Sequence, residues 1–367
     1  MSSKKDKTIS SDKYFMSVAM NLANNRNDFT GLNPSVGCLI VKNNQILSFG
    51  QTGFGGRPHA EFEAIKKCKK KDLKNSTIYI TMEPCTHYGK TPPCIDLIIK
   101  SKIKRVVYSV NDKDERTAQK AFTILKSKNI TVSKGLLVNN MKKIYKKYFF
   151  QKKNKKPYIA AKIACSKDYY TSTINKVITN NYSRRLSHLL RYKYDSILTT
   201  SQTVNSDNPI LDCRLNGLEK FSPKRLILDK NLVVSKSSKI INGKNNKNII
   251  IFHSSKNTSK INFFRSKGIK LIYIPLNKNN QINLKQVFKE VYNNDISSII
   301  IEGGKILTES LIKNKLINEF YLFKSNKKLG KLGDNNIKGI ERKLSTVFKN
   351  KKKIETFLDE NELIKYY

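Results

Sequence analysis

One stretch of the chain holds residue types that could bind and use a metal ion. It begins with His59 and Glu61 and ends with Cys85 and Cys94. One imidazole and two thiols are typical zinc ligands, and three protein ligands leave a fourth position for water, which zinc ionises near neutral pH. A Glu two residues after the His is typical of zinc-dependent nucleobase deaminases, in which it carries protons and does not bind the metal. The pattern predicts a catalytic zinc site with His59, Cys85 and Cys94 as ligands and Glu61 as proton carrier.

A structural zinc site is the alternative for these residues. It would need a fourth protein ligand, and His87 is the only candidate nearby. A structural site has no need of a free Glu61, so we favour a catalytic site in which His87 contacts the substrate.

The elements that would position these residues alternate along the first half of the chain. Apolar runs predict strands at residues 36–41, 45–50, 77–81, 105–110 and 130–133. Helical spacing of apolar residues predicts helices at 14–25, 59–70 and 117–127, after a disordered start over 1–10. Thr91 is expected to cap the helix whose first turn contains Cys94. This alternation predicts an α/β/α sandwich.

Three motifs of this half show a family resemblance. They read Asn33-Pro-x-Val-Gly-Cys, His59-Ala-Glu and Glu83-Pro-Cys-x-His-x-Gly-Lys-Thr-Pro-Pro-Cys. They resemble the deaminase half of RibD, the bifunctional deaminase and reductase family of riboflavin biosynthesis, which has a cytidine-deaminase-like fold. The resemblance implies that Asn33, His87 and Lys90 hold the substrate. One departure stands out: the family's Asp-Pro-Asn-Pro stretch and the Gly after it read Asp112-Lys-Asp-Glu and Gln119 here.

The second half repeats strand and helix signals after a basic segment over 142–156, which reads as a closing helix and a linker. Strands are predicted at 158–164, 195–200, 224–228, 248–252, 270–274 and 297–301. Helices are predicted at 179–191, at 284–292 and from 306 onward. We therefore expect two domains, 1–150 and 155–367.

The second half resembles the reductase half of the same family, which has a dihydrofolate-reductase-like α/β fold and uses NADPH. The matching stretches begin at Ser166-x-Asp, at Asp195-x-Ile-Leu and at Glu302-Gly-Gly. The last of these follows a strand and precedes a helix, where backbone can approach a phosphate. The resemblance implies cofactor contacts from Thr203, Asp207, Gly303 and Gly304, and substrate contacts from Arg191, Leu211, Arg214 and Glu302, with the two Arg near the phosphate.

This half departs further from the family pattern. Tyr169 and Tyr170 replace a Gly and a basic residue, and the family's Trp aligns near Val177. A degenerate second domain that leaves only the deaminase is therefore the alternative. The main expectation is deamination of 2,5-diamino-6-ribosylamino-4(3H)-pyrimidinone 5′-phosphate, followed by NADPH-dependent reduction of its ribosyl chain to give 5-amino-6-ribitylamino-uracil 5′-phosphate.

Composition bears on partners and location. The net charge of +43 would suit a polyanion partner, but Lys and Asn are spread along the whole chain and no nucleic-acid-binding motif accompanies them. A nucleic-acid base deaminase is a rival reading that the long spacing between Cys85 and Cys94 disfavours. The polar N-terminus, the lack of an apolar run of ~20 residues and six scattered Cys predict a cytoplasmic enzyme without a membrane segment. The resemblance implies a homo-oligomer.

Overall fold

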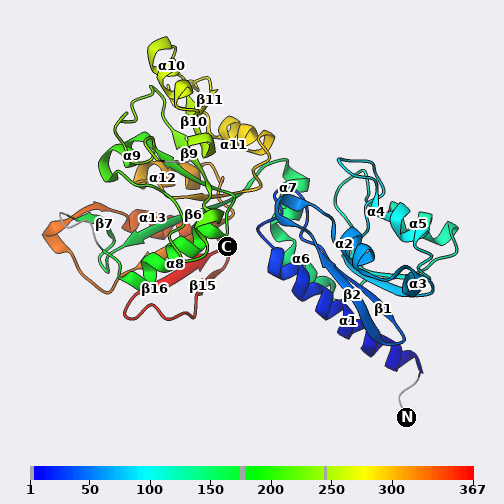
Figure 1. The fold of residues 1–367 in the computed structure, drawn as a ribbon. Helices are drawn as coiled ribbons and strands as arrows, with labels where there is room; N and C mark the ends of the chain where they lie inside the picture. The colour runs from blue at the N-terminus through cyan, green and yellow to red at the C-terminus, as the bar shows by residue number, and fades with distance from the viewer. Residues whose placement is uncertain (1–3, 174–177, 244–245) are drawn as a thin grey trace. The chain divides into compact units, whose positions relative to one another are not determined.

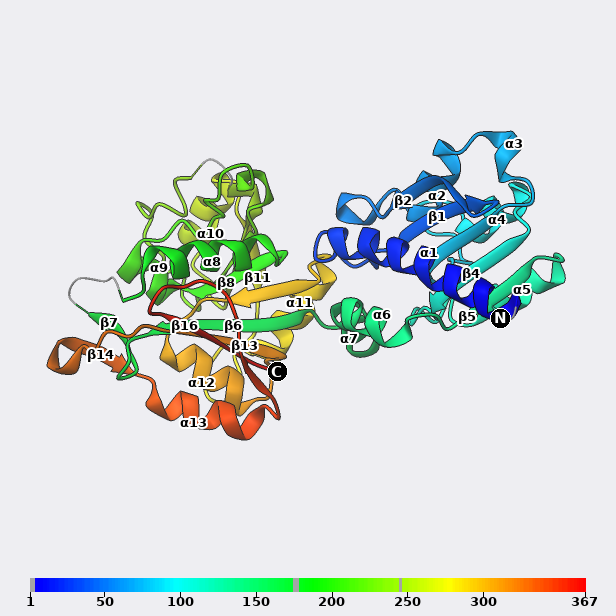
Figure 2. The same ribbon diagram turned by 90° about the horizontal axis from the view of Figure 1, so that it is seen from below.

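The chain divides into two units, Met1–Lys155 and Lys156–Tyr367, and each has its own sheet and hydrophobic cores. The computed structural model describes residues 4–173, 178–243 and 246–367. Figures 1 and 2 show the two units from two directions. Within these described ranges, no helix combines the length and the apolar character that crossing a bilayer requires.

The first unit contains a five-stranded sheet. Its strands are β1 (Gly37–Lys42), β2 (Gln45–Gln51), β3 (Thr77–Met82), β4 (Arg105–Val110) and β5 (Thr131–Lys134). Its helices are α1 (Lys4–Arg26), α2 (Ala60–Lys67), α3 (Lys70–Leu73), α4 (Cys94–Lys100), α5 (Lys120–Ser127), α6 (Val138–Ile144) and α7 (Lys146–Asn154). The strand order is β2-β1-β3-β4-β5, with β3, β4 and β5 parallel and β1 antiparallel to both neighbours.

Helices cover both faces of this sheet, which explains why consecutive residues of β1, β3 and β4 are buried. Helices α1 and α6 pack on one face, as Figure 1 shows for α1, and α2, α4 and α5 pack on the other. The sequence predicted this sandwich. Because β3 and β4 are parallel, the segments that follow them emerge at the same edge of the sheet, and these segments carry Cys85 and Asp112.

Three local predictions for this unit were wrong. The start of the chain is helical from Lys4, since α1 continues through the polar residues before its apolar stripe. The closing segment is two helices, because the chain breaks at Tyr145. Thr91 does not cap α4: Pro93 precedes that helix without a side-chain cap, and Cys94 is its first residue.

The second unit is built on a nine-stranded sheet. The unit's strands are β6 (Tyr158–Cys165), β7 (Tyr170–Thr173), β8 (Ser196–Thr200), β9 (Lys224–Leu228), β10 (Ile249–His253), β11 (Lys270–Tyr273), β12 (Ser298–Ile301), β13 (Glu319–Lys324), β14 (Gly333–Asn336), β15 (Lys351–Lys353) and β16 (Glu362–Tyr366). The large sheet has the order β11-β10-β9-β8-β12-β6-β13-β16-β15; β16 is antiparallel to both of its neighbours, and all other pairs are parallel. Strands β7 and β14 form a separate pair.

Helices again cover both faces of the large sheet. They are α8 (Asn181–Tyr192), α9 (Ser201–Asp207), α10 (Thr258–Ser266), α11 (Leu284–Asn293), α12 (Lys305–Lys313) and α13 (Lys338–Val347). Alternate residues of β12 face different cores: Ile299 and Ile301 pack against α11, α12 and α13, whereas Ile300 packs on the side of α8, α9 and α10 (Figure 2). The sequence analysis assigned no element to β7, α9, α10 or the chain after α12. Strand β7 is short and polar, whereas β13 carries a run of four buried apolar residues that the prediction missed.

Candidate functional site

The three predicted zinc ligands come from three separate elements and meet at one point. His59 immediately precedes α2, Cys85 follows β3, and Cys94 opens α4. His59 Nδ1 lies 3.3 Å from the Cys94 Sγ and 3.7 Å from the Cys85 Sγ, and all three ligand atoms lie within 4.8 Å of one another. Nitrogen and sulfur ligands of one tetrahedral zinc are about 3.5 Å apart. The donor set and its spacing therefore fit a zinc ion.

Backbone contacts hold the two thiols in place. The backbone N–H of Cys94 donates to the Cys85 Sγ over 3.2 Å, and the N–H of Ile95 donates to the Cys85 carbonyl over 3.2 Å. Hydrogen bonds from the Cys94 thiol and from this N–H lower the pKa of the Cys85 thiol to about 4, although burial opposes the shift. The same thiol pairing, together with burial, raises the pKa of Cys94. The pairing thus favours a thiolate at Cys85, the form in which cysteine would bind a metal ion.

Arg57 orients the imidazole of His59 from its other side. Its Nη1 lies 3.4 Å from His59 Nε2 and donates to the Thr91 Oγ1 over 2.6 Å. Thr91, which we expected to cap a helix, therefore links the loop before Cys94 to the residues before α2. This contact leaves Nδ1 directed at the two thiols.

Glu61 lies in the first turn of α2, and its side chain is buried beside the thiols. Burial and the negative charge of Cys85 raise the pKa of Glu61 to about 7. A carboxyl group with a pKa near neutrality can both take and return a proton at physiological pH.

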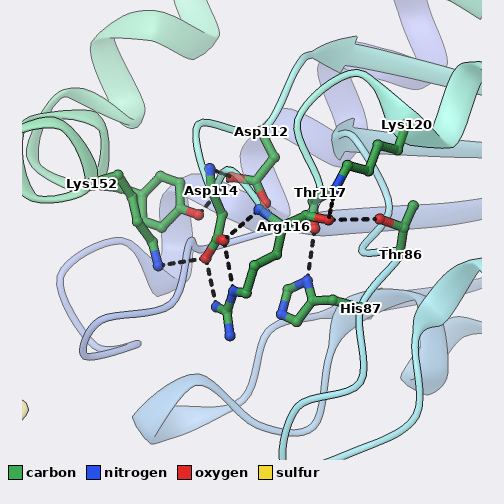
Figure 3. Close-up of polar contacts among 9 residues, drawn as sticks. Thr86, His87, Asp112, Asp114, Arg116, Thr117, Lys120 and Lys152 are labelled. Carbon is green, nitrogen blue, oxygen red and sulfur yellow. Dashed lines mark hydrogen bonds and ion pairs between the residues drawn. The ribbon is translucent and has the colours of Figure 1, made fainter.

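The predicted substrate residues of this unit lie around the cluster. Asn33 is half-buried, and its Nδ2 donates to the Gly56 carbonyl over 3.5 Å. Gly56 has a φ of +90°, and an added Cβ would lie only 2.2 Å from that Nδ2, so a glycine is required for this close approach. His87 Nδ1 contacts the Thr117 Oγ1 at 2.9 Å, as Figure 3 shows, and Lys90 is exposed on the same loop as His87.

Glu83 organises the segment after β4, and sequence reasoning gave it no role. Its carboxylate accepts the backbone N–H groups of Asp112, Gln119 and Ala121 over 3.0 to 3.1 Å. Gln119 has a φ of +64°, which explains why the resembling family has Gly at this position. An acid at the end of a buried strand, directly before a Pro, was the signal available in the sequence.

A cluster of charged residues connects the loop between β4 and α5 to helix α7. Asp114 accepts hydrogen bonds from Arg116 Nε at 2.8 Å and Nη2 at 2.7 Å, and from Lys152 Nζ at 2.9 Å. Figure 3 shows both cations converging on this carboxylate. The hydroxyl of Tyr148 donates to the Asp112 Oδ1 over 2.7 Å. Arg116 and Lys152 hold the pKa of Asp114 well below its usual range, although burial opposes them. These bonds fix the loop that contacts His87.

In the second unit, Glu302 and Arg191 form a largely buried ion pair. The carboxylate accepts hydrogen bonds from Arg191 Nε at 2.8 Å and Nη2 at 3.0 Å, and Lys162 Nζ lies 3.5 Å from its Oε2. Burial alone would raise the pKa of Glu302, but the charges of Lys162 and Arg191 hold it below its usual range. The sequence pointed to Glu302 and Arg191 separately and did not point to Lys162. The fork of Arg191 that we expected near a phosphate is thus occupied by a carboxylate.

A cavity of about 310 Å³ brings together four of the predicted residues, Arg191, Asp207, Leu211 and Arg214. Leu211 has a φ of +58°, a strained conformation for a branched side chain that clusters at functional sites. The other four lie elsewhere: Thr203 stands in α9, and Glu302, Gly303 and Gly304 connect β12 to α12.

Two glycines, Gly303 and Gly304, form the turn before α12. Gly304 directly precedes the helix, and no atom lies within 4 Å of a Cβ placed on it. Gly304 is exposed, so the start of α12 is accessible to a ligand on the side of this residue. Gly303 has a packing role, since an added Cβ would lie 2.7 Å from the Leu307 Cδ2.

Tyr169 and Tyr170 keep the turn that the resembling family builds with glycine. Tyr169 takes up the turn's positive φ, +71°, and its hydroxyl accepts the Lys324 ammonium over 3.0 Å. The ring of Tyr170 lies against Gly333, where an added Cβ would come within 2.3 Å of it. Tyr170 thus packs within the β7 and β14 pair, and Tyr169, which precedes β7, contacts β13. Val177, where the family's Trp aligns, lies outside the described residues.

Two family models match the chain. The model described as the RibD C-terminal domain matches residues 157–357, and the model described as the cytidine and deoxycytidylate deaminase zinc-binding region matches residues 9–110. The fold-class prediction, a deaminase-like unit followed by a reductase-like unit, is confirmed.

Curated proteins and solved structures agree with these matches. The riboflavin biosynthesis protein RibD of Aquifex aeolicus is 33% identical over 350 residues, which cover 94% of this chain and 95% of that protein. The RibD of Escherichia coli is 30% identical over 333 residues, covering 87% and 89%. The structure of Acinetobacter baumannii RibD has a TM-score of 0.84 at 26% identity, covering 98% and 99%. A Thermotoga maritima diaminohydroxyphosphoribosylaminopyrimidine deaminase and 5-amino-6-(5-phosphoribosylamino)uracil reductase has a TM-score of 0.79 at 27% identity with the same coverage.

Proposed function

Since this chain belongs to the RibD family of riboflavin biosynthesis proteins, we propose that its two units act in turn on one phosphorylated pyrimidine. The first unit is a zinc-dependent hydrolytic deaminase and the second is an NADPH-dependent reductase. The deaminase substrate is 2,5-diamino-6-ribosylamino-4(3H)-pyrimidinone 5′-phosphate, and the reductase then gives 5-amino-6-ribitylamino-uracil 5′-phosphate. The position of buried Glu61 beside His59, Cys85 and Cys94 carries this proposal.

The residues of the first unit have two roles in deamination, metal binding and proton transfer. His59, Cys85 and Cys94 would hold zinc, which lowers the pKa of water toward ~7. Glu61 takes a proton from the attacking water and returns it to the exocyclic amine as the bond between ring carbon and nitrogen breaks. Water thus supplies the new carbonyl oxygen, and ammonia leaves. The near-neutral pKa of Glu61 suits both transfers.

Asn33, His87 and Lys90 hold the substrate in this proposal. Lys90 is exposed and cationic, so it suits the 5′-phosphate. His87 is held by Thr117, and Thr117 lies in the loop that Glu83 and Asp114 fix, which keeps the imidazole at a defined position.

In the second unit NADPH supplies the hydride. Thr203, Asp207, Gly303 and Gly304 contact the cofactor in our proposal, with its phosphate at the start of α12. Leu211 and Arg214 contact the substrate. Glu302 and Arg191 support the same cavity through their ion pair.

Glu61→Gln tests the deaminase assignment. Gln preserves the volume and cannot shuttle a proton, so we expect zinc content to stay unchanged while ammonia release falls by about 10²–10⁴. Glu63→Gln, on the same helix and paired only with Lys67 in the contacts described, is the matched control and should retain activity. Near-full turnover in Glu61→Gln would overturn the assignment.

A degenerate second unit is the alternative that Tyr169 and Tyr170 suggest. Purified protein mixed with the deaminated substrate and NADPH decides between the two, because an active reductase consumes the NADPH absorbance. No oxidation above background would leave the deaminase alone.

A structural zinc site and a nucleic-acid base deaminase are less well supported. His87, the one nearby candidate for a fourth ligand, directs Nδ1 at Thr117, and the ligand cluster in the described residues contains three members. A gel shift with nucleic acid at physiological salt would revive a polyanion partner. The homo-oligomer and the cytoplasmic location stay predictions, which light scattering and cell fractionation test.

A further inference from the structure

His188 is a half-buried histidine of α8 that no step described above uses. It stands one helical turn before Arg191, so the two side chains lie on the same face of the helix. Its Nδ1 lies 3.0 Å from the carbonyl oxygen of Asp212 and 3.2 Å from the backbone nitrogen of Arg214, whose N–H points at it. In one tautomer Nδ1 donates to the carbonyl, and in the other it accepts the N–H. Both bonds reach the same loop.

This loop forms a wall of the cavity in the second unit. Arg191 Nη1 donates to the same Asp212 carbonyl over 3.1 Å, so α8 holds the loop at two adjacent points. Arg191 is itself fixed by Glu302, whereas the Arg214 side chain is largely exposed and has a 3.3 Å ion pair with Asp212. The backbone position of Arg214 therefore depends on His188 more than on contacts of its own side chain.

We infer that His188 is a positioning residue of the reductase, which holds the backbone of residues 212–214 so that Arg214 presents its guanidinium to the phosphate of the substrate. The inference rests on the proposed function of the cavity and concerns which residue sets its geometry. His188 touches neither cofactor nor substrate in this role. It acts through Arg214, so its loss should weaken phosphate binding and leave the chemical step unchanged.

The charges around His188 favour its neutral ring. Burial, Arg191 on its own helix and Arg214 on the facing loop lower its pKa, and the Asp212 carbonyl and carboxylate oppose them. A neutral imidazole keeps an acceptor at Nδ1 for the Arg214 N–H in one of its tautomers, which an imidazolium cannot do.

Replacing His188 by Asn and by Gln tests this role with two amides of similar polarity. The amide of Asn lies at the position of Nδ1, and the amide of Gln reaches the position of Nε2. We expect His188→Asn to keep near-normal kinetics. His188→Gln and His188→Ala should raise KM for the phosphorylated substrate about tenfold, the loss of roughly one hydrogen bond's support. The kcat and the KM for NADPH should stay within about twofold.

Calorimetry with ribose 5-phosphate as the probe separates this inference from the reductase proposal. The positioning role is supported if the wild-type protein and His188→Asn both bind the probe and His188→Gln binds it more weakly. This result would hold even where no NADPH is consumed. Equal losses in Asn and Gln, an unchanged KM in His188→Ala, or a fall in kcat with KM unchanged would each overturn it. Should His188→Ala fail to fold, the Asn and Gln pair still decides.

Discussion

The Cys85 thiol accepts a hydrogen bond of 3.2 Å from the backbone N–H of Cys94, the first residue of α4. The helix start thus supports both sulfur ligands: it supplies one thiol and stabilises the thiolate form of the other.

Cys94→Ser should remove one zinc ligand while it keeps the backbone N–H that donates to the Cys85 Sγ. Serine binds zinc poorly, so bound metal should fall from about one ion per chain to a small fraction of that value. Metal analysis of the purified full-length protein measures the change. Cys68→Ser, which alters a buried thiol of the same unit away from the cluster, should retain zinc. Equal zinc loss in both variants would contradict the ligand assignment.

Asp114 makes stability depend on pH. Arg116 and Lys152 depress the pKa of Asp114 in the folded protein. The contribution of this carboxylate to folding stability is therefore fully present above the pKa of an unfolded Asp, ~3.9, and is lost as the pH falls through the lower pKa of the folded state. We expect Asp114→Asn to cost about 1.5–3 kcal/mol at pH 7. Denaturant unfolding from pH 7 down to about 3 should show the difference between wild type and variant shrinking below about pH 4.

Glu115→Gln, an exposed acid of the same loop, is the control for that series and should change stability little at any of these pH values. A wild-type advantage over Asp114→Asn that stays constant down to pH 3 would contradict the ion-pair explanation.

Gln119→Gly should stabilise the loop after β4. Gln119 is held at a φ of +64°, which costs a side-chain-bearing residue about 1–2 kcal/mol, and glycine avoids most of that cost while keeping the N–H that Glu83 accepts. After the extra chain entropy of glycine, the net gain should be up to about 1 kcal/mol. Gln119→Ala, which retains a Cβ, should give no gain, and an equal gain in both variants would rule out the backbone explanation.

Glu302→Gln should destabilise the second unit. The substitution leaves the charges of Lys162 and Arg191 buried without a counter-charge, and breaking a buried pair in this way costs about 3–5 kcal/mol. Glu309→Gln removes a half-exposed partner of Lys343 and should cost at most about 1 kcal/mol. Unfolding of both full-length variants by denaturant provides the comparison. Similar small losses of unfolding free energy in the two variants would show that the Glu302 ion pair is not desolvated.

The zinc site of the first unit could be predicted from the sequence because its residues lie in short local motifs. His59 and Glu61 are two residues apart at a helix start, and Cys85 and Cys94 follow a strand and open a helix, so residue type and spacing identify them. The alternation of apolar strands and helices likewise predicted the five strands of the first sheet and six of the nine strands of the large second sheet, since burial on two faces leaves a continuous apolar run.

The tertiary structure alone decided which distant groups meet. The three backbone N–H groups at Glu83, the ion pair of Glu302 with Arg191 and the contact of His188 with the 212–214 loop join residues from 24 to 111 positions apart. No local pattern encodes such pairings, because the sequence does not show whether a charged residue or a histidine faces solvent or a buried partner. Only the path of the chain through the fold fixes the partner, and with it the pKa and the role of each group.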